Sequence, residues 1–494
     1  MRAGELLSAI GVNAHQEIDG IEVTAIVTDS KKVIKNCIFI CLCGSKYDGH
    51  DYIPDAVAAG AAVIVAEKVR DVCVGGAAIF YVENTRRAAS LLYNAWYGYP
   101  SQGIKTVGVT GTNGKTSTAR MAYRIFEDAG YRCGFIGTIG IFFAFGRELP
   151  KSGNMTTPDP ETLYSVLAQM RDDGVEYLFM EVSSHALAQC RTDAIEFDIA
   201  VFTNLTEDHL DFHKNMEDYY LSKRKLFEQS KRSIVNVDDT YGKHLACFIE
   251  NKKGFLKTCS LRQGDFCALP QNGKAERGIA YDLKFEKNTY RVLLPLSGEF
   301  QIMNSLEAAA VALSCGVEAE KVIASLGSMS EIPGRMEELR AHTSQEFRVF
   351  IDYAHTPDAL EKLLLSARAL RKESGRIILL LGCGGEREIE KRRVMGQIAS
   401  KLADMVIVTS DNPRGEDPDG IIKDILKGID KEKQYTVIRD RREAIERAVL
   451  EYAREGDILL LAGKGHERYQ IDAFGMHGFD ERKIVDNALT LRYR

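Results

Sequence analysis

A glycine-rich segment between an apolar run and a predicted helix constrains the fold of this chain more than any other feature. Residues 104–109 are rich in β-branched side chains and predict a strand, and Gly111 and Gly114 follow it. Lys115 and Thr116 then open the predicted helix. Backbone N–H groups of such a loop bind phosphate, the Lys neutralises phosphate charge and the Thr hydroxyl can ligate Mg²⁺. The segment therefore predicts a strand–loop–helix unit of an α/β domain that binds ATP.

The glycine spacing of this segment differs from the general phosphate-loop pattern. That pattern requires glycine five residues before Gly114, where Val109 stands, and the glycine lies one position earlier at Gly108. The alternative is a strand-to-helix turn that binds nothing. Gly-Lys-Thr at the start of a helix argues against that alternative.

The length and composition indicate a soluble globular protein of roughly three domains. The chain has 494 residues, 45% hydrophobic and 27% charged, with a formal net charge of −6. This balance gives no support to nucleic-acid binding, and the basic cluster at 223–225 by itself indicates a solvated helical face. No apolar run approaches the roughly 20 residues of a membrane span, and no signal peptide is recognised, so we expect a cytoplasmic protein with no membrane partner.

The eleven cysteines include no C-x-x-C pair, which argues against a common zinc site. Cys37, Cys41 and Cys43 lie in an apolar segment, and we expect them to be small core residues.

The order of apolar runs predicts an α/β fold of three domains, comprising residues 1–98, 99–334 and 335–494. Residues 99–103 are interpreted as a linker, and residues 254–295 as an excursion of antiparallel sheet. Four apolar strands are predicted in the last third, at residues 349–352, 377–381, 405–409 and 457–462, and each ends in polar or glycine residues. Ligands bind at the carboxyl ends of parallel strands, so these loops predict one site. The spacing of Gly382, Gly384 and Gly385 does not match a dinucleotide fingerprint, and NAD binding is discounted.

Two further residues stand where a metal-binding side chain is useful. Glu181 ends an apolar strand near the phosphate loop, and a carboxylate there is well placed to hold Mg²⁺. His209 follows another predicted strand. Taken alone, Glu181 could equally be an ordinary strand-end residue, and a lone His is more often structural than a ligand.

Six motifs together resemble the Mur ligase and folylpolyglutamate synthase superfamily, and they cover essentially the whole chain. They are T-G-T-N-G-K-T at 110–116, E-V-S-S-H at 181–185, D-H-L-D at 208–211, G-R-M-E at 334–337, D-Y-A-H-T-P at 352–357 and A-G-K-G-H-E at 462–467. The strongest similarity is to the branch that adds the third residue of the peptidoglycan stem peptide.

The resemblance implies a fold and a reaction. The N-terminal α/β domain would bind the UDP end of the substrate, the central domain would be a P-loop ATPase with a mainly parallel sheet, and the C-terminal domain would be Rossmann-like and bind the amino acid. ATP would phosphorylate a carboxylate of UDP-N-acetylmuramoyl-L-alanyl-D-glutamate, and an amine would attack the acyl phosphate. Phosphoryl transfer depends on positioning and charge neutralisation, which Lys115, Thr116, Glu181 and His209 would supply around Mg²⁺.

The resemblance also implies the remaining site residues. Lys223 stands where similar enzymes carry a carbamylated lysine that ligates Mg²⁺, although its neighbours Leu221, Ser222 and Lys225 differ from the usual ones. Met155 stands where many relatives have Asn or Leu. Nucleotide binding is expected of Gly111, Thr112, Asn113, Gly114, Lys115, Thr116, Ser117, Asn304, Arg335 and Asp352, and binding of the UDP-sugar peptide of Ser30, Thr156, Thr157, Ser183, Gln189 and Arg191.

The choice of amino acid is expected to depend on Asp411-Asn412-Pro413-Arg414. In similar enzymes D-N-P-R accompanies meso-diaminopimelate, and lysine-adding relatives lack the Arg. A guanidinium can hold the second carboxylate of diaminopimelate bidentately, and it would be left unpaired by lysine. We expect Arg387, Gly463 and Glu467 to complete this site, with Arg392 and Arg393 as competitors of Arg387. D-N-P-R could also be simply an Asx-type turn closed by proline.

Three alternatives remain open at this point. A folylpolyglutamate synthase would lack the N-terminal block with Asp29-Ser30-Lys31. A lysine-adding ligase is the nearer rival. A Mur-ligase-like binding protein without activity is disfavoured by the joint presence of Lys115, Glu181, His209 and Lys223. The partners expected are small-molecule substrates, and the chain is expected to act as a monomer.

Overall fold

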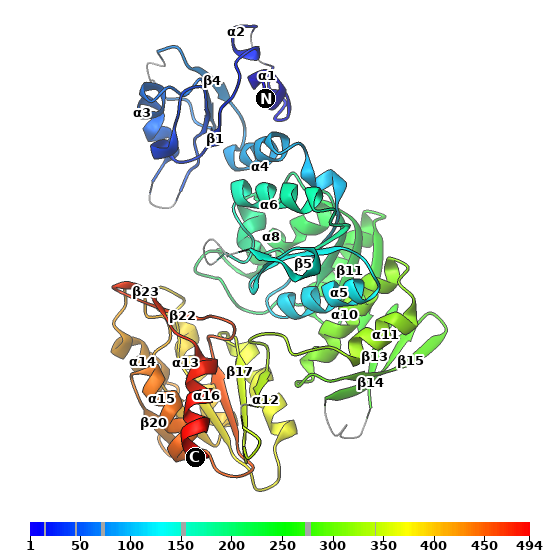
Figure 1. Cartoon of the computed structure of the whole chain (residues 1–494), viewed down its shortest axis with the longest axis vertical. Coiled ribbons are helices and arrows are strands. Elements are labelled where there is room, and N and C mark those ends of the chain that lie inside the picture. Colours follow the sequence, from blue (N-terminus) through cyan, green and yellow to red (C-terminus); the bar gives the residue numbers. More distant parts are fainter. Residues whose placement is uncertain (14–15, 45–46, 71–74, 150–154, 272–277, 341) are drawn as a thin grey trace.

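The computed structural model describes residues 1–13, 16–44, 47–70, 75–149, 155–271, 278–340 and 342–494. Three sheets follow one another along the chain and form three lobes, which Figure 1 shows with the N-terminal lobe at the top and the C-terminal lobe at the lower left. The α/β fold of three domains predicted from the sequence is confirmed.

The N-terminal lobe contains a four-stranded parallel sheet in the order β1-β2-β3-β4. Its strands are short but almost wholly apolar, and helix α4 covers one face through Ala88, Leu92 and Tyr93. The elements are α1 (Ala3–Ser8), α2 (Gln16–Asp19), β1 (Ile26–Val27), η1 (Ser30–Lys32), β2 (Ile38–Ile40), η2 (Gly49–Tyr52), α3 (Ile53–Ala58), β3 (Val63–Ala66), β4 (Ala78–Tyr81) and α4 (Thr85–Trp96).

The central lobe is built on an eleven-stranded sheet in the order β15-β14-β13-β12-β11-β10-β5-β9-β6-β7-β8. The seven central strands, in the order β13-β12-β11-β10-β5-β9-β6, pair in parallel. The outer strands β14 and β15 at one edge, and β7 and β8 at the other, pair antiparallel. The strands are β5 (Lys105–Thr110), β6 (Cys133–Gly137), β7 (Gly140–Phe142), β8 (Glu148–Leu149), β9 (Tyr177–Glu181), β10 (Phe197–Phe202), β11 (Ser230–Asn236), β12 (Phe255–Ser260), β13 (Phe266–Pro270), β14 (Ile279–Phe285) and β15 (Asn288–Leu294).

Helices cover both faces of the central sheet, and α10 packs on α5, the helix that follows the phosphate loop (Figure 1). The interface between α5 and α10 is made of small and apolar side chains, including Ala119, Ala122, Ala308 and Ala312, which let the two helices approach closely. The elements are η3 (Pro100–Gly103), α5 (Lys115–Asp128), η4 (Ala144–Gly146), α6 (Pro160–Asp172), α7 (Ser184–Ala188), α8 (Met216–Glu228), α9 (Thr240–Asn251), α10 (Phe300–Ser314) and α11 (Ala319–Gly327).

The C-terminal lobe has a six-stranded sheet in the order β16-β17-β21-β18-β19-β20, parallel except for β16. Successive residues of β18 and β21 enter two different apolar clusters, so both faces of the sheet are buried, as expected of a parallel sheet. The elements are β16 (Glu337–Leu339), β17 (Arg348–Asp352), α12 (Pro357–Leu370), β18 (Ile377–Leu381), α13 (Glu390–Leu402), β19 (Met405–Val408), α14 (Pro418–Leu426), β20 (Gln434–Val437), α15 (Arg441–Arg447), η5 (Ala448–Tyr452), β21 (Ile458–Ala462), β22 (Tyr469–Asp472), β23 (Gly475–Gly478) and α16 (Glu481–Arg492).

Two local predictions need correction, and a third segment is better packed than its composition suggests. Residues 99–103, interpreted as a linker, contain η3, in which Pro100 and Ser101 are buried and the Ser101 hydroxyl donates to Asn94 Oδ1 at 3.0 Å. Within residues 254–295, β12 pairs in parallel with β11 and with β13, and only the β13–β14 and β14–β15 pairs are antiparallel. Cys43 is not a core residue: it is half-buried, and its thiol contacts the carboxylates of Asp48 and Glu67.

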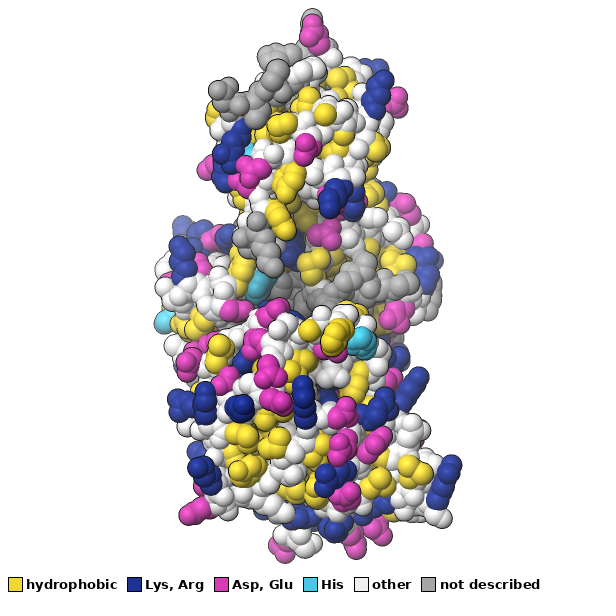
Figure 2. All heavy atoms as spheres, turned by 90° about the vertical axis from the view of Figure 1, so that its left-hand side faces the viewer, with side chains coloured by type: hydrophobic (Ala, Val, Ile, Leu, Met, Phe, Trp, Pro, Cys, Tyr) yellow, Lys and Arg dark blue, Asp and Glu magenta, His cyan; other side chains and the backbone are white. Residues whose placement is uncertain are grey.

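Surface charge is mixed. On the face shown in Figure 2, Lys and Arg side chains alternate with Asp and Glu, and neither sign gathers into a large patch. None of the helices in the described ranges combines the length and apolarity that crossing a membrane requires.

Candidate active site

A cavity of about 750 Å³, called here the first cavity, is lined by residues of both the central and the C-terminal lobe. It lies where β5, β9 and β10 of one sheet and β17, β18, β19 and β21 of the other end, which is the ligand-binding edge of parallel sheets. The site residues predicted from the sequence that line it are Thr112, Asn113, Gly114, Lys115, Thr116, Ser117, Thr156, Glu181, Ser183, Arg191, His209, Asn304, Arg335, Asp352, Arg387, Asp411, Asn412, Arg414, Gly463 and Glu467.

The phosphate loop requires its two glycines. Gly111 and Gly114 have φ values of +151° and +90°. A Cβ atom on Gly111 would lie 1.9 Å from Thr203 Oγ1, and one on Gly114 would lie 2.5 Å from Asn304 Oδ1. Any larger residue would push the loop away from β10 or α10.

Lys115 lies inside this loop. Its Nζ donates to the carbonyl oxygens of Gly111 and Thr112, at 2.9 and 2.8 Å. Burial lowers the pKa of Lys115, and nearby Arg335 lowers it further, while the Glu181 carboxylate opposes both effects. The ammonium is thus held at the loop by weak carbonyl partners that a phosphate can replace.

Glu181 at the end of β9 is fully buried and accepts from hydroxyl and backbone donors. Thr116 Oγ1 donates to its Oε2 at 2.9 Å, while Thr138 donates its backbone N–H to Oε1 at 2.8 Å and its hydroxyl to Oε2 at 2.9 Å. The sequence alone left this residue open to a purely structural role. The structure places its carboxylate directly beside the phosphate-loop threonine.

His209 stands in the left-handed region at φ +57°, beside Asp208, whose Oδ2 lies 3.3 Å from its Nε2. Burial lowers the pKa of His209 to about 3, more than the Asp208 charge raises it. Its ring packs edge-on to His185, with centroids 4.8 Å apart. A neutral imidazole in this wall is suited to ligate a cation.

Lys223 on α8 does not line the first cavity, but it reaches the phosphate loop from behind. The side chain is buried, and its Nζ donates to Gly111 O at 2.8 Å. Burial depresses the pKa of Lys223 well below its usual value, and the neighbouring Lys115 depresses it further, with Asp208 opposing. The composition-based view of a solvated lysine is therefore wrong, because α8 turns this residue toward the loop.

The other nucleotide residues come from α10 and the start of the C-terminal lobe. Asn304 Nδ2 donates to Gln301 Oε1 at 2.9 Å. Arg335 donates to Thr116 Oγ1 at 2.8 Å, and its buried Nε has no hydrogen-bond partner within the described part of the chain. Asp352 accepts from the backbone N–H groups of Met336 and Ala354, at 2.6 and 2.7 Å. Burial raises the pKa of Asp352 despite the nearby Arg335 charge.

A second contact also crosses between the lobes. Asn113 of the phosphate loop donates through Nδ2 to Asp358 Oδ2 at 2.7 Å, and Lys362 Nζ lies 2.9 Å from the same oxygen. Asp358 stands in the first turn of α12. Two hydrogen bonds, Arg335 to Thr116 and Asn113 to Asp358, therefore join the phosphate-loop segment to the C-terminal lobe.

Arg414, Asn412 and Glu467 lie on the C-terminal wall. Arg414 has φ +53°, a strained conformation for a non-glycine residue, and its NH1 donates to Gly385 O at 2.6 Å. Asn412 Nδ2 donates to Glu467 Oε2 at 2.9 Å. Burial raises the pKa of Glu467, and the Asp411 charge raises it further, while Lys464 opposes both.

The structure separates the three arginines that competed for the amino-acid site. Arg387 lines the first cavity, with its NH1 3.7 Å from Asp211 Oδ2. Arg392 is buried away from the cavity, and its guanidinium lies 2.9 Å from Glu416 and 3.1 Å from Asp424. Arg393 is exposed and does not line the cavity within the described chain.

Sequence reasoning missed Lys464, although the motif that contains it was recognised. This fully buried lysine donates to Asn412 Oδ1 at 2.8 Å and to Tyr469 O at 2.9 Å, and lies 3.1 Å from Asp411 Oδ1. It is also 3.9 Å from Glu467 Oε2. His355, which donates from Nδ1 to Tyr353 O at 2.9 Å and lines the cavity, was likewise quoted within a motif without a role. Asp358 directly follows that motif and was not singled out.

Several predicted residues lie outside the first cavity. A second cavity of about 820 Å³ lies between the N-terminal and central lobes; Gln189 lines it, and Arg191 lines both cavities. Thr157 is fully buried and accepts from Ser183 N at 3.0 Å, so it supports the wall from behind. Ser30, Gly111, Lys223 and Pro413 line neither cavity.

Comparison with known sequence families gives three matches in chain order. Residues 22–92 match the Mur ligase family catalytic domain, 109–312 the Mur ligase middle domain, and 334–465 the Mur ligase glutamate ligase domain. Together they span more than half of the chain.

Curated relatives match over nearly the full length. UDP-N-acetylmuramoyl-L-alanyl-D-glutamate–2,6-diaminopimelate ligase 1 of Clostridium acetobutylicum is 41% identical and covers 94% of each chain. The ligase of the same name, without the number, from Aquifex aeolicus is 40% identical, again with 94% of each chain covered.

Solved structures of related ligases have the same fold. A structure of a UDP-N-acetylmuramoyl-L-alanyl-D-glutamate–2,6-diaminopimelate ligase superposes with a TM-score of 0.70 at 30% identity, covering all of both chains. Mycobacterium tuberculosis folylpolyglutamate synthase shares the fold, with a TM-score of 0.61 at 19% identity and coverage of 83% of this chain and 95% of that one. Three family models match the chain in order, and relatives of 40–41% identity cover 94% of it. The chain therefore belongs to the Mur ligase family.

Proposed function

We propose that the chain is an ATP-dependent amide ligase that joins meso-diaminopimelate to the D-glutamate carboxylate of UDP-N-acetylmuramoyl-L-alanyl-D-glutamate. The γ-phosphoryl group of ATP passes to the carboxylate oxygen and ADP leaves. The amine then attacks the acyl phosphate carbon, the C–O bond to phosphate breaks, and an amide, phosphate and a proton are released. The relatives with full-length coverage carry the name of this reaction.

The proposal rests on one observation: the first cavity is lined both by the phosphate loop and by the loops proposed to bind the amino acid. Lys115 and Thr116 of the phosphate loop form one wall, and Arg414 and Glu467 of the amino-acid loops form another. An acyl phosphate hydrolyses readily in water, so its amine acceptor must be bound beside it before it forms. A two-lobed cavity meets that requirement.

The residues around the phosphate loop suit Mg²⁺, which when bound would neutralise phosphate charge. Glu181 offers a buried carboxylate whose partners are hydroxyl and N–H donors rather than a cation. Thr116 offers a hydroxyl and His209 a neutral imidazole. Lys223 is buried with a depressed pKa, so a neutral amine is available to add CO₂ and become a carbamate, an anionic oxygen donor. We propose these four as the metal-binding set.

The nucleotide-sugar substrate would extend across both cavities. Arg191 lines both of them, so a substrate whose glutamate carboxylate lies near Lys115 can pass Arg191 and continue into the second cavity. Ser183, Thr156 and Gln189 lie along that path, and Thr28 and Lys32 of the second cavity flank Ser30 in sequence. The UDP end would then lie between the N-terminal and central lobes.

Selection of diaminopimelate over lysine is assigned to Arg414, with Arg387 nearby. Both guanidinium groups line the amino-acid side of the cavity, and a carboxylate is their natural partner. Glu467 on the same wall can pair with an ammonium group. Bound lysine has no second carboxylate, so a guanidinium in the cavity would lack an anionic partner, and the binding of lysine is disfavoured.

The domain boundaries proposed are 1–98, 99–334 and 335–494, and each contains one of the three large sheets. We propose that the chain acts as a monomer. Light scattering on the purified protein tests this.

The test of the function is mass spectrometry of the product formed from UDP-N-acetylmuramoyl-L-alanyl-D-glutamate, ATP and either meso-diaminopimelate or L-lysine. We expect a tripeptide product with diaminopimelate, and ATP consumption only when all three substrates are present. Preferential addition of lysine would refute the assignment of Arg414. ATP turnover without any amide product would refute the ligase itself.

A further inference from the structure

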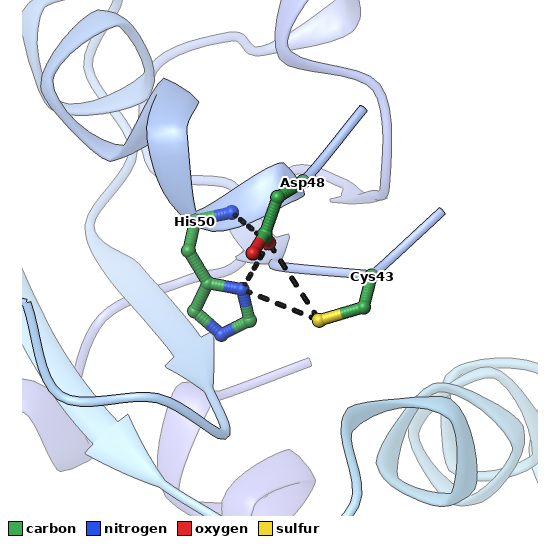
Figure 3. A group of neighbouring side chains, drawn as sticks. All are labelled: Cys43, Asp48 and His50. Atoms are coloured by element: carbon green, nitrogen blue, oxygen red, sulfur yellow. Dashed lines mark hydrogen bonds and ion pairs between the residues drawn. The ribbon is translucent and has the colours of Figure 1, made fainter. Parts of the chain in front are cut away.

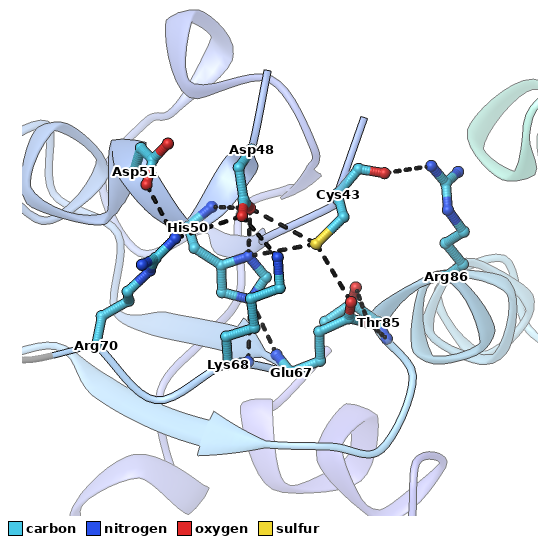
Figure 4. Close-up of polar contacts among 9 residues, drawn as sticks. All are labelled: Cys43, Asp48, His50, Asp51, Glu67, Lys68, Arg70, Thr85 and Arg86. Atoms are coloured by element: carbon cyan, nitrogen blue, oxygen red, sulfur yellow. Dashed lines mark hydrogen bonds and ion pairs between the residues drawn. The ribbon is translucent and has the colours of Figure 1, made fainter. Parts of the chain in front are cut away.

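A network of polar side chains lies behind the N-terminal wall of the second cavity. It joins Cys43, Asp48, His50, Glu67 and Thr85 through the bonds drawn in Figure 4. None of these five lines the second cavity; the lining residues on this side include Leu42 and Arg86. The substrate would therefore not touch the network, although it would touch residues that the network holds.

The hydrogen bonds of His50 determine where its proton lies. Its Nε2 is within 3.0 and 3.2 Å of the backbone nitrogens of Glu67 and Lys68, and both are N–H donors. Nε2 is therefore the acceptor, so Nδ1 carries the proton and donates to Asp48 Oδ1 at 2.6 Å. The ring is buried, and it fastens the Asp48 turn to the end of β3.

This tautomer excludes the metal site that the residue types suggest. Cys43, Asp48 and His50 offer ligand atoms within 4.8 Å of one another (Figure 3). A metal on Nδ1 would require the proton on Nε2, where it would face two N–H groups instead of the acceptor that a metal-bound histidine uses. Burial also raises the pKa of the Cys43 thiol, which donates to Glu67 Oε1 at 3.2 Å. The cluster is a hydrogen-bonded clamp.

The clamp holds two elements of the cavity wall together. On one side, Cys43 and Asp48 pair as an isolated antiparallel bridge. On the other, Glu67 Oε2 accepts from both the backbone N–H and the hydroxyl of Thr85, each at 2.9 Å, at the first residue of α4. Arg86, the next residue of α4, donates to Cys43 O at 2.5 Å. One arginine thus spans the turn and the helix.

We propose that Arg86 binds the diphosphate of the nucleotide-sugar substrate in the second cavity, and that His50 is a positioning residue for Arg86. This inference rests on the proposed function. Arg86 donates one N–H to Cys43 O, which orients the guanidinium in the cavity that it lines. A guanidinium has further N–H donors that can bind an anion there. Lys32 and Arg191 line the same cavity and add positive charge. Two acids also line this cavity, Asp159 and Glu161, and the Asp159 oxygens accept from the N–H and hydroxyl of Thr162.

The test uses the full-length protein and two ligands, UDP and UDP-N-acetylmuramoyl-L-alanyl-D-glutamate. Calorimetry gives the Kd of each ligand, and steady-state kinetics give separate KM values for the three substrates. We expect Arg86→Gln to raise the Kd of UDP and the KM of the nucleotide-sugar substrate at least tenfold. The kcat and the KM of ATP and of diaminopimelate should stay within threefold. Arg87→Gln is the matched control, because Arg87 is the exposed neighbour on the same helix and does not line the cavity.

His50 is tested by a double-mutant cycle. His50→Leu removes both ring hydrogen bonds and should raise the same Kd and KM severalfold, while His50→Gln, which keeps an acceptor and a donor, should recover part of the loss. In the Arg86→Gln background, His50→Leu should raise the Kd of UDP and the KM of the nucleotide-sugar substrate by less than twofold further, because its effect passes through Arg86. A purely structural role would instead lower kcat or raise all three KM values. Should His50→Leu fail to fold, Arg86→Gln and His50→Gln still decide the question.

The outcomes separate this inference from the function on which it rests. A wild-type protein that binds neither ligand and makes no amide would refute both. A wild-type protein that binds UDP and makes amide, with Arg86→Gln unchanged in Kd, would refute the inference and leave the function standing. A full effect of His50→Leu in the Arg86→Gln background would refute the positioning role.

Discussion

Lys115 and Lys223 donate to the same carbonyl oxygen, that of Gly111, at 2.9 and 2.8 Å. Two ammonium groups this close and this buried repel each other, and Lys115 is accordingly a cause of the depressed pKa of Lys223. Lys115 of the phosphate loop thus acts electrostatically on Lys223 of α8. It favours the neutral form of Lys223, and neutral amines are the form that reacts with CO₂.

The first prediction concerns this pair. Removing dissolved CO₂ and bicarbonate should lower the activity of the enzyme, and adding bicarbonate should restore it. With ¹³C-bicarbonate, NMR should show a carbamate signal in the wild type that is missing in Lys223→Ala. The variant should also lose activity by about 1,000-fold, the scale of a lost electrostatic contribution to phosphoryl transfer. Lys225→Ala, on the same helix, is the control, and an equal carbamate signal in Lys223→Ala would contradict the assignment.

The second prediction concerns amino-acid choice. Arg414→Ala should lower kcat/KM for diaminopimelate by about 100-fold, since a charge-assisted contact to its second carboxylate is lost. The KM of ATP should not change, because Arg414 reaches toward Gly385 rather than the phosphate loop. Competition between diaminopimelate and lysine, followed by product mass spectrometry, measures the change in selectivity. Arg393→Ala, exposed and outside the cavity, should behave as wild type; retained selectivity in Arg414→Ala would point to Arg387 instead.

The third prediction concerns Lys464, which holds Asn412 and neutralises Asp411 and Glu467. Lys464→Met should raise the KM of diaminopimelate at least tenfold with little effect on the KM of ATP. Loss of the lysine charge also raises the pKa of Glu467 further, so more of it is protonated at neutral pH and unable to pair with an ammonium. The KM of the variant should therefore fall as the pH rises. Lys483→Met, an exposed lysine of α16, is the control.

The fourth prediction concerns Glu307, buried on α10 behind the phosphate-loop helix. Its Oε2 accepts from Thr118 Oγ1 at 2.8 Å, and its Oε1 has no hydrogen-bond partner within the described chain. Burial raises its pKa from 4.5 to about 8. Because the folded pKa is the higher one, its contribution to stability is complete below pH 4.5 and is lost as the pH rises to 8.

Glu307→Gln removes this titration. The free energy of unfolding of the variant minus that of the wild type should increase by roughly 1.4 kcal/mol per pH unit between pH 6 and 8. The difference should reach a total on the order of a few kcal/mol and then stay constant at higher pH. Calorimetric unfolding of both proteins across that range measures it. Glu320→Gln, an exposed residue of α11, should show no such trend. A constant difference between Glu307→Gln and wild type would show that Glu307 does not titrate on unfolding.

Particular elements show how far sequence reasoning reaches. Strands β17, β18, β19 and β21 were predicted to within one residue because each is a dense apolar run ended by glycine or polar residues. Residues 21–27 have the apolar, β-branched composition of a single strand, yet only Ile26 and Val27 pair in the ladder as β1. The segment around Ser101 has the composition of a linker. Its packing, including the hydrogen bond from Ser101 to Asn94, could not be predicted from that composition.

The sequence by itself determined the phosphate-loop motif and the order of the lobes and indicated candidate site residues, because these depend on local spacing and on motifs that are contiguous along the chain. Only the tertiary structure decided which of those residues meet. Contacts such as Asn113 with Asp358, or Arg335 with Thr116, join positions more than 200 residues apart, and packing between lobes creates them. The same holds for charge: Lys223, His209 and Glu307 carry ordinary side chains in the sequence, and their pKa shifts arise from burial, which no local pattern encodes.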